Sequence, residues 1–96
     1  MRTPPGYKEA YTKYIEDGWT SLSCDPKYGG QGMPKTVSAF FDEMLSSASL
    51  SFKLYSELSI GAYNCINHHA TDEIKNIYLP KIVEGKWSGT MCLTEP

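Results

Sequence analysis

Apolar residues recur every three or four positions in four successive stretches of this chain, and polar or charged residues fill the places between them. This period is typical of amphipathic helices that bury one face. We therefore expect four helices, near residues 7–17, 35–48, 52–69 and 72–84. Because helices with apolar faces stabilise one another by packing together, the predicted fold is all-α. It is a small helical bundle of about four helices with a C-terminal extended segment.

Residues that favour helix ends stand at the borders of these stretches. Gly18 and Gly85 can adopt the left-handed conformation that closes a helix, and each follows one of the stretches. Pro34 suits the first position of a helix, and Thr71 suits the cap that precedes one. Pro80 interrupts the fourth stretch, so we expect a kink or a restart of the helix there.

Glycine carries information in two further places. Residues 19–34 contain several glycines and prolines without a regular period, which predicts a loop. Residues 30–35 lack the glycine spacing of a dinucleotide turn and the Gly-Lys-Ser/Thr of a phosphate loop, so they indicate a tight turn into the next helix. Gly61 lies inside the third predicted helix, where glycine costs about 1 kcal/mol relative to alanine. It indicates either the close approach of another backbone or a ligand, or simple tolerance.

The composition limits the classes of function. With 96 residues the chain has room for one small domain, and 41% apolar residues are ordinary for a globular protein. A net charge of −2 argues against nucleic-acid partners, because a general grip on nucleic acid requires a basic surface. No apolar run approaches the roughly 20 residues of a membrane span. The N-terminus lacks the apolar stretch of a secretory signal.

Cysteine and histidine are the candidates for reactive or metal-binding side chains. Cys24, Cys65 and Cys92 fit neither a disulfide framework nor a zinc motif, so we expect reduced, buried thiols in a cytoplasmic protein. A reactive Cys65 beside the two histidines would lack a third partner. His68 and His69 point about 100° apart on a helix and have no spaced carboxylate or cysteine set, so we expect no metal site.

The last ten residues differ in character from the rest. Residues 87–96 lose the helical period and resemble an extended strand, with Met91 and Leu93 on one face. A single strand beside helices leaves its backbone N–H and C=O groups without partners. We therefore expect this chain to be part of something larger.

Four motifs, found in the same order, resemble those of the acyl-CoA dehydrogenase family. Residues 87–96, WSGTMCLTEP, are similar to its flavin-binding strand, which carries a C-x-T-E-P or A-x-T-E-P run. Residues 18–34 resemble its first loop, and residues 71–81 resemble its T-x-E-x-K-x-x-Y-L-P-K helix. Gly85 and Trp87 match its G-x-W turn. The resemblance covers essentially the whole chain.

The resemblance implies a domain organisation and an activity. Family members have an α-helical N-terminal domain, a β-barrel middle domain and a C-terminal four-helix bundle, and FAD lies between the last two. Residues 1–86 would be the N-terminal helical domain, truncated at its start, and residues 87–96 the first strand of the middle domain, also truncated. The implied reaction is the α,β-dehydrogenation of an acyl-CoA thioester by a homo-oligomer that passes electrons to an electron-transfer acceptor.

The resemblance assigns flavin contacts, but no catalytic residue, to this chain. In the family a glutamate of the C-terminal domain removes the α-proton, and nothing here matches it, because Glu95 belongs to the T-E-P turn. We therefore expect the fragment to be inactive alone and not to retain FAD. The implied flavin contacts are Met91, Leu93 and Thr94, since a hydroxyl and backbone groups can satisfy the polar edge of the ring. Many relatives have an aromatic residue in place of Met91.

A second set of residues is implied for the substrate. Lys53, Glu57 and Gly61 follow one another at intervals of four residues, so they form one ridge of a helix that would line the base of the acyl tunnel. Gly61 would widen the tunnel. Lys53 and Glu57 suit an alkyl neighbour only when they are paired, and a solvated surface is the alternative for this face.

A function of another class stays open, namely a stand-alone helical interaction or oligomerisation module without catalysis. A stripe of aromatic residues without a covering helix could mediate self-association. These residues are Tyr7, Tyr11, Trp19, Phe40 and Phe41.

Overall fold

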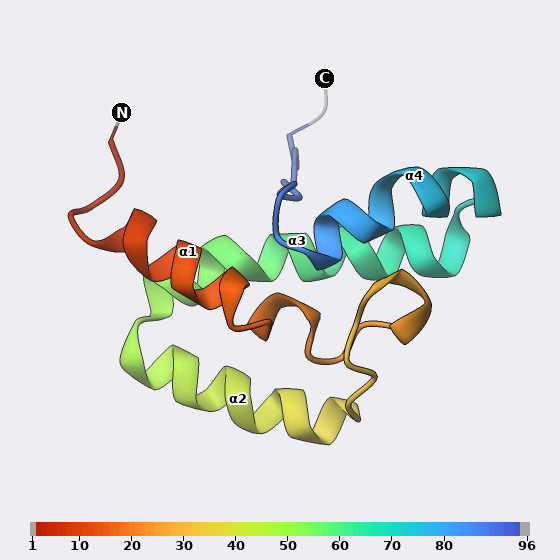
Figure 1. The fold of residues 1–96 in the computed structure, drawn as a ribbon. Helices are drawn as coiled ribbons and strands as arrows, with labels where there is room; N and C mark the ends of the chain where they lie inside the picture. Colours follow the sequence, from red (N-terminus) through yellow and green to blue (C-terminus); the bar gives the residue numbers. More distant parts are fainter. Residues whose placement is uncertain (1, 95–96) are drawn as a thin grey trace.

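The computed structural model describes residues 2–94, and its regular structure is helical (Figure 1). The helices are α1 (Tyr7–Glu16), α2 (Lys35–Ala48), α3 (Leu50–His69) and α4 (Asp72–Val83). Two short 3-10 turns, Trp19–Ser21 and Pro26–Tyr28, lie in the predicted loop between α1 and α2. No residue from 2 to 94 lies in a strand. The predicted all-α bundle is confirmed, and every helix begins and ends close to its predicted bounds.

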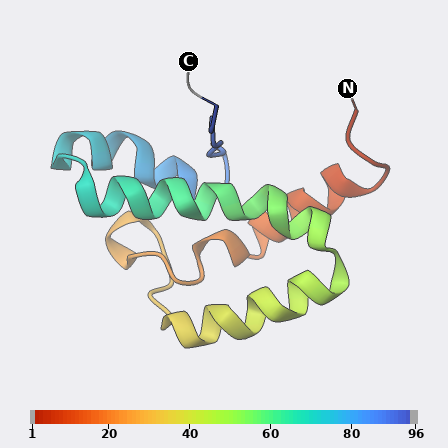
Figure 2. The same cartoon turned by 180° about the vertical axis from the view of Figure 1, so that it is seen from behind.

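The longest helix, α3, organises the bundle. Two opposite views place α2 on one side of α3 and α4 on the other (Figures 1 and 2). The aromatic side chains of α1 pack against Phe52 in the first half of α3. The domain measures 38 × 38 × 21 Å. Because a helix with its side chains is about 10 Å across, the thinnest dimension holds two layers of helices, and much of each helix stays exposed.

The helix ends confirm most of the sequence prediction. Gly18 and Gly85 follow α1 and α4 with φ angles of 82° and 76°, in the left-handed region that glycine favours. Thr71 caps α4, and its hydroxyl accepts a hydrogen bond from the N–H of Ile74 at 3.5 Å. Asp72 lies in the first turn, where the helix dipole favours a negative charge.

Three details of the helix ends differ from the prediction. Pro34 precedes the first helical residue instead of occupying it. The Ser49 hydroxyl accepts a hydrogen bond from the N–H of Phe52 and so caps α3, which therefore begins at Leu50. At Pro80 the sequence predicts a kink or a restart, and the restart is wrong, because α4 continues through Pro80 to its end. One helical turn follows the proline, and three buried side chains hold the end of the helix in the core, namely Leu79, Ile82 and Val83.

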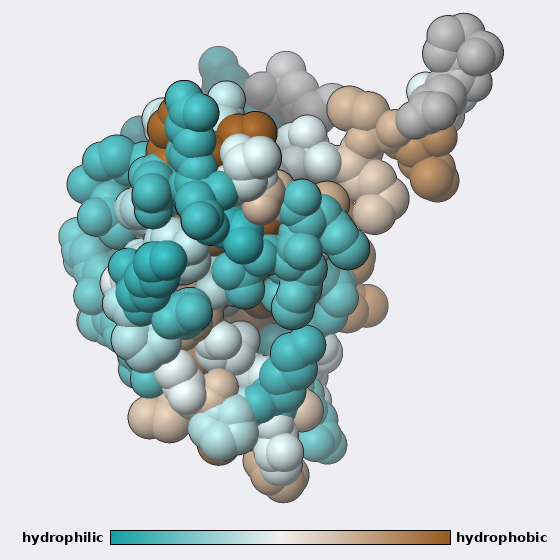
Figure 3. All heavy atoms as spheres, turned by 90° about the vertical axis from the view of Figure 1, so that its right-hand side faces the viewer, coloured by the Kyte–Doolittle hydropathy of each residue, from teal (hydrophilic) through white to brown (hydrophobic). Residues whose placement is uncertain are grey.

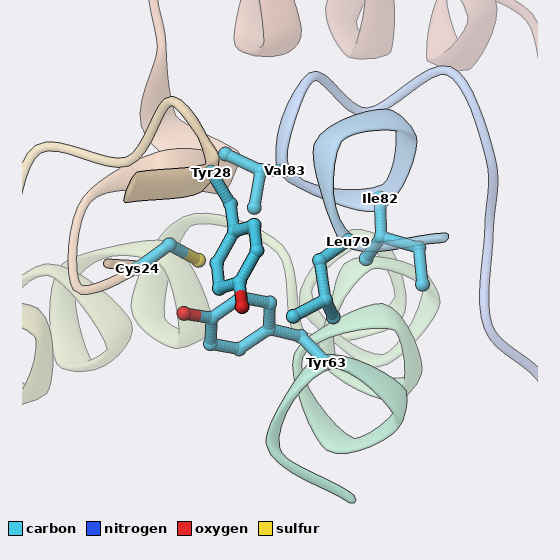
Figure 4. Close-up of a cluster of buried hydrophobic side chains, with 6 residues drawn as sticks. All are labelled: Cys24, Tyr28, Tyr63, Leu79, Ile82 and Val83. Atoms are coloured by element: carbon cyan, nitrogen blue, oxygen red, sulfur yellow. The ribbon is translucent and has the colours of Figure 1, made fainter. Parts of the chain in front are cut away.

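The hydrophobic core lies where the loop between α1 and α2 meets α3 and α4 (Figure 4). Leu79 is fully buried at its centre. The hydroxyl of Tyr63 accepts a hydrogen bond of 2.8 Å from the backbone N–H of Asp25, which ties the loop to α3. Figure 4 shows the side chains of Cys24, Tyr28, Tyr63, Leu79, Ile82 and Val83 directed toward one another.

A second, aromatic cluster joins α1, α2 and α3. The rings of Trp19 and Phe41 stack with centroids 4.5 Å apart, and Tyr14 meets Phe52 edge-on at 5.5 Å. Such pairs contribute about 0.5–1.5 kcal/mol beyond the area they bury. Of the five aromatic residues expected on an uncovered stripe, Trp19 and Phe40 are exposed, at 41% and 65%. The other three, Tyr7, Tyr11 and Phe41, are half-buried because they pack in this cluster.

The cysteines behave differently from one another. Cys24 is buried in the core, and burial raises its pKa from 9.0 to about 11. Cys65 and Cys92 are exposed, so the prediction of buried thiols is wrong for them. Cys65 lies on the outer face of α3, and Cys92 lies in the extended segment that follows α4.

Two further properties of the described residues bear on other classes of site. Residues 2–94 contain no group of three or more His, Cys, Asp or Glu side chains placed to hold a metal ion. Within the same residues, no helix is both long enough and apolar enough to cross a membrane.

Candidate functional site

The chain that leaves α4 is fastened to the helices in three places. We call residues 85–89 the joint. The phenol of Tyr11 on α1 donates a hydrogen bond of 3.1 Å to the carbonyl of Gly85. The ring of Trp87 lies 5.7 Å from the ring of Tyr78 on α4. The N–H of Gly89 donates a hydrogen bond of 3.1 Å to the hydroxyl of Ser59 on α3. The joint therefore has a defined path over the bundle.

Tyr11 is partly buried between the joint and α3. Burial raises the pKa of its phenol, and the hydroxyl of Ser88 lowers that pKa by a smaller amount. The edge of the Tyr11 ring meets Tyr55 of α3 at a centroid distance of 5.2 Å. One side chain of α1 thus touches both the joint and α3.

Gly89 packs directly on the backbone of α3. A Cβ atom at this position would lie 2.8 Å from the carbonyl oxygen of Leu58 and 3.2 Å from the Cα of Ser59. It would also overlap the Cβ of Ala62. Only glycine allows this approach. Neither Gly89 nor Ser59 was predicted from the sequence, because their contact joins residues far apart in the chain and leaves no local pattern.

Beyond the joint, residues 90–94 stand away from the bundle, and we call them the arm. Figure 3 shows a short projection in hydrophobic colours beside a mostly hydrophilic face. Met91 and Leu93 are 66% and 83% exposed, and Thr94 is exposed as well. The structure thus presents all three predicted flavin contacts on one short segment. Glu95 lies outside the described residues.

The three predicted substrate residues form a ridge on α3. The ammonium of Lys53 and the carboxylate of Glu57 are 2.6 Å apart. The side chain of Lys53 is largely covered, at 17% exposure, whereas Glu57 is half-exposed. Gly61 is exposed, and a Cβ added there would meet open space. No described segment of this chain approaches Gly61. The interpretation that Gly61 allows another backbone of the described residues to come close is therefore wrong.

The ridge and the joint are neighbours on α3. Gly89 rests on Leu58 and Ala62, each of which directly follows a ridge residue in the sequence. Successive helical residues are about 100° apart around the axis, so the arm leaves the bundle beside the ridge. Leu54 and Leu58 are 54% and 39% exposed and add apolar surface there. The structure thereby brings the two predicted sets of site residues to one part of the molecule.

An open apolar groove of about 600 Å³ lies between α1 and α2, away from the joint. Tyr14, Trp19 and Phe41 form its aromatic wall, and Lys13 and Asp17 lie at its lining. Its breadth and its apolar lining suit a protein segment better than a small ligand. Three of the five aromatic residues that the sequence marks as an uncovered stripe line this groove, namely Tyr7, Trp19 and Phe41.

Comparison with known proteins shows that the chain is similar to one family over almost its whole length. The family model described as acyl-CoA dehydrogenase, N-terminal domain, matches residues 2–86. A 3-methylmercaptopropionyl-CoA dehydrogenase of Ruegeria pomeroyi is 45% identical over 97% of this chain and 16% of its own length. A butyryl-CoA dehydrogenase of Syntrophomonas wolfei is 40% identical over 98% of this chain. A broad-specificity linear acyl-CoA dehydrogenase of Mycobacterium tuberculosis is 30% identical over 97% of it. The chain spans 15% of the length of each of these last two.

Proposed function

The chain belongs to the acyl-CoA dehydrogenase family, and we propose that it is the N-terminal helical part of an enzyme that dehydrogenates acyl-CoA thioesters with FAD. Residues 1–86 form the helical domain in this proposal, and residues 87–96 begin the middle domain. The single observation that supports the proposal is the exposed arm beside the α3 ridge, because the residues that would contact the flavin lie next to those that would contact the acyl chain.

The residues of the arm suit a flavin ring. Thr94 supplies a hydroxyl, and the extended backbone supplies N–H and C=O groups for the polar edge of the ring. Met91 offers a polarisable side chain that packs well against an aromatic face. FAD, when bound, supplies the acceptor for the hydride that leaves the substrate. The part of the arm in this proposal is to hold and orient the ring.

The ridge suits the acyl chain of the substrate. The ion pair of Lys53 and Glu57 neutralises two charges that would disfavour an alkyl neighbour, and Gly61 leaves room beside them. The exposed Leu54 and Leu58 extend this surface with apolar groups. We therefore place the base of the acyl tunnel along this face of α3.

No residue of this chain is assigned to proton abstraction, so the 96-residue chain alone should not oxidise acyl-CoA. It should not hold FAD firmly either. Its arm is a single exposed segment and can supply only part of a binding site for the ring. The full-length enzyme in this proposal is a cytoplasmic homo-oligomer that passes its electrons to a separate acceptor.

The experiment that tests the proposal uses the full-length protein that carries this domain. It should purify with one FAD per subunit, and saturating butyryl-CoA without an electron acceptor should bleach the flavin absorption. Longer linear acyl-CoA thioesters serve as alternative substrates. A full-length protein without bound FAD, or a bound flavin that no acyl-CoA thioester reduces, would contradict the proposal.

A second candidate is a helical interaction module, and one face of α2 favours it. Val37, Phe40 and Met44 follow helical spacing and are 43%, 65% and 64% exposed. An apolar stripe of this kind is typical of a protein–protein contact. Sedimentation of the 96-residue chain tests it. Concentration-dependent association that Phe40→Ser abolishes supports the module, and a monomer at all concentrations contradicts it.

A further inference from the structure

We propose that Gly89 is a positioning residue that holds the arm at a fixed direction beside the α3 ridge, with Ser59 as its partner. This inference rests on the proposed function, because it concerns the same flavin and substrate surfaces. It assigns a role to two residues outside both predicted sets. The hydrogen bond from Gly89 to Ser59 fastens the end of the joint, and residues 90–94 beyond it are all exposed.

The contact is rigid on the side of the helix. After the Cβ of Ala62, at 2.5 Å, the atoms closest to an added Cβ are the Leu58 carbonyl oxygen, at 2.8 Å, and the Ser59 Cα, at 3.2 Å. Both belong to the backbone of α3, which cannot move aside without losing helical hydrogen bonds. A side chain at position 89 would therefore push the arm outward and leave the helix in place.

A small displacement at the joint becomes larger along the arm. Five residues of extended chain reach at most about 17 Å. A rotation of about 10° at Gly89 would therefore move the far end of the arm, at Thr94, by roughly 3 Å. Binding groups must stay within about 0.5 Å of their productive geometry. The close packing of Gly89 is thus a physical means of holding the arm to that tolerance.

The first experiment measures the joint in the 96-residue chain without any cofactor. Amide exchange should show the Gly89 N–H to be protected, and ¹⁵N relaxation should report the motion of residues 90–94. Ser59→Ala should reduce the Gly89 protection roughly two- to tenfold, as expected for one lost hydrogen bond. Gly89→Ala should increase the motion of the arm. Ser47→Ala on α2 is the control and should leave both readouts unchanged. An unprotected Gly89 amide in the unsubstituted chain would overturn the proposal.

The second experiment measures the FAD dissociation constant of the full-length protein. Gly89→Ala should weaken FAD binding about tenfold or more and shift the flavin absorption band, because misplacement of about 1 Å is costly. Ser59→Ala should act in the same direction with a smaller effect. Ala62→Gly removes one of the atoms that crowd position 89 and should restore part of the affinity lost in Gly89→Ala. Ser47→Ala again serves as the control.

The outcomes separate this inference from the proposed function. If the unsubstituted full-length protein binds no FAD, the proposed function fails and the positioning role fails with it. If it binds FAD and Gly89→Ala binds FAD equally well with an unchanged spectrum, the positioning role alone is overturned. A weaker affinity in both substitutions, with unchanged helical circular dichroism, supports the role.

Discussion

Two leucines that are close in the sequence show how differently this chain uses the same side chain. Leu79 lies at the centre of the core and has no exposed surface, whereas Leu93 on the arm is 83% exposed. Leu79 packs among residues of α3, α4 and the loop after α1, so residues of this chain alone bury its side chain. Leu93 has an apolar side chain with the same capacity for burial, but it faces away from the bundle.

The contrast separates residues that stabilise the fold from residues available for binding. Burying a leucine side chain contributes about 1.5–3 kcal/mol. In the core that free energy stabilises the bundle, and in the arm it is available to whatever covers the segment. The joint lies between the two regions, because Gly85 and Gly89 tie the beginning of the segment to α1 and α3.

Leu79→Ala should lower the free energy of unfolding by about 2–5 kcal/mol, because the substitution leaves a cavity in the core. Leu93→Ala is the matched control and should change it by less than about 0.5 kcal/mol. Urea denaturation followed by circular dichroism measures both. Equal effects of the two substitutions would break the contrast.

High pH should destabilise the core through Cys24. Burial raises its pKa from 9.0 to about 11 in the folded state. Between these values the unfolded chain loses the thiol proton while the folded chain keeps it, so stability falls as the pH rises. The loss amounts to at most about 3 kcal/mol for one group shifted by this amount.

Urea denaturation at pH 8 to 11 measures this dependence. Cys24→Ala should give a shallower decline than the unsubstituted chain, and Cys65→Ala, which changes an exposed cysteine, should not. Equal slopes in all three proteins would show that the Cys24 thiol is not sheltered by the core.

Tyr63→Phe should lower the free energy of unfolding by about 1–3 kcal/mol, because the N–H of Asp25 loses its acceptor. Tyr78, which is 44% exposed on α4, provides the control substitution Tyr78→Phe. Thermal unfolding of both variants decides the matter. A melting temperature of Tyr63→Phe equal to that of the control would show that the loop is held in another way.

The helices could be predicted from the sequence because the spacing of apolar residues within each helix marks the face that it buries. The cap at Thr71 and the left-handed glycines at 18 and 85 are equally local, and they were found. The helical cap at Ser49 was missed, and the sequence left open a kink or a restart at Pro80, where α4 continues. A serine-rich stretch does not single out its capping residue, and the packing that tolerates a helical proline comes from other elements.

The candidate site was only partly accessible to sequence reasoning. The ridge of Lys53, Glu57 and Gly61 follows from helical spacing, and the structure adds the ion pair. The arm was found by resemblance to a family, and its binding role stays a prediction. The contact of Gly89 with α3 and the exposure of Cys65 depend on how the chain folds back on itself. No local pattern encodes either of them.

Thr94→Val in the full-length protein tests whether the arm binds FAD. The substitution keeps the shape of the side chain and deletes one hydroxyl, a loss of about 0.5–1.5 kcal/mol for one hydrogen bond. If the arm binds FAD, the substitution should weaken FAD binding about two- to tenfold and shift the flavin spectrum. Thr36→Val, at an exposed threonine of α2, should bind FAD like the unsubstituted protein. Unchanged affinity and spectrum in Thr94→Val would contradict the account.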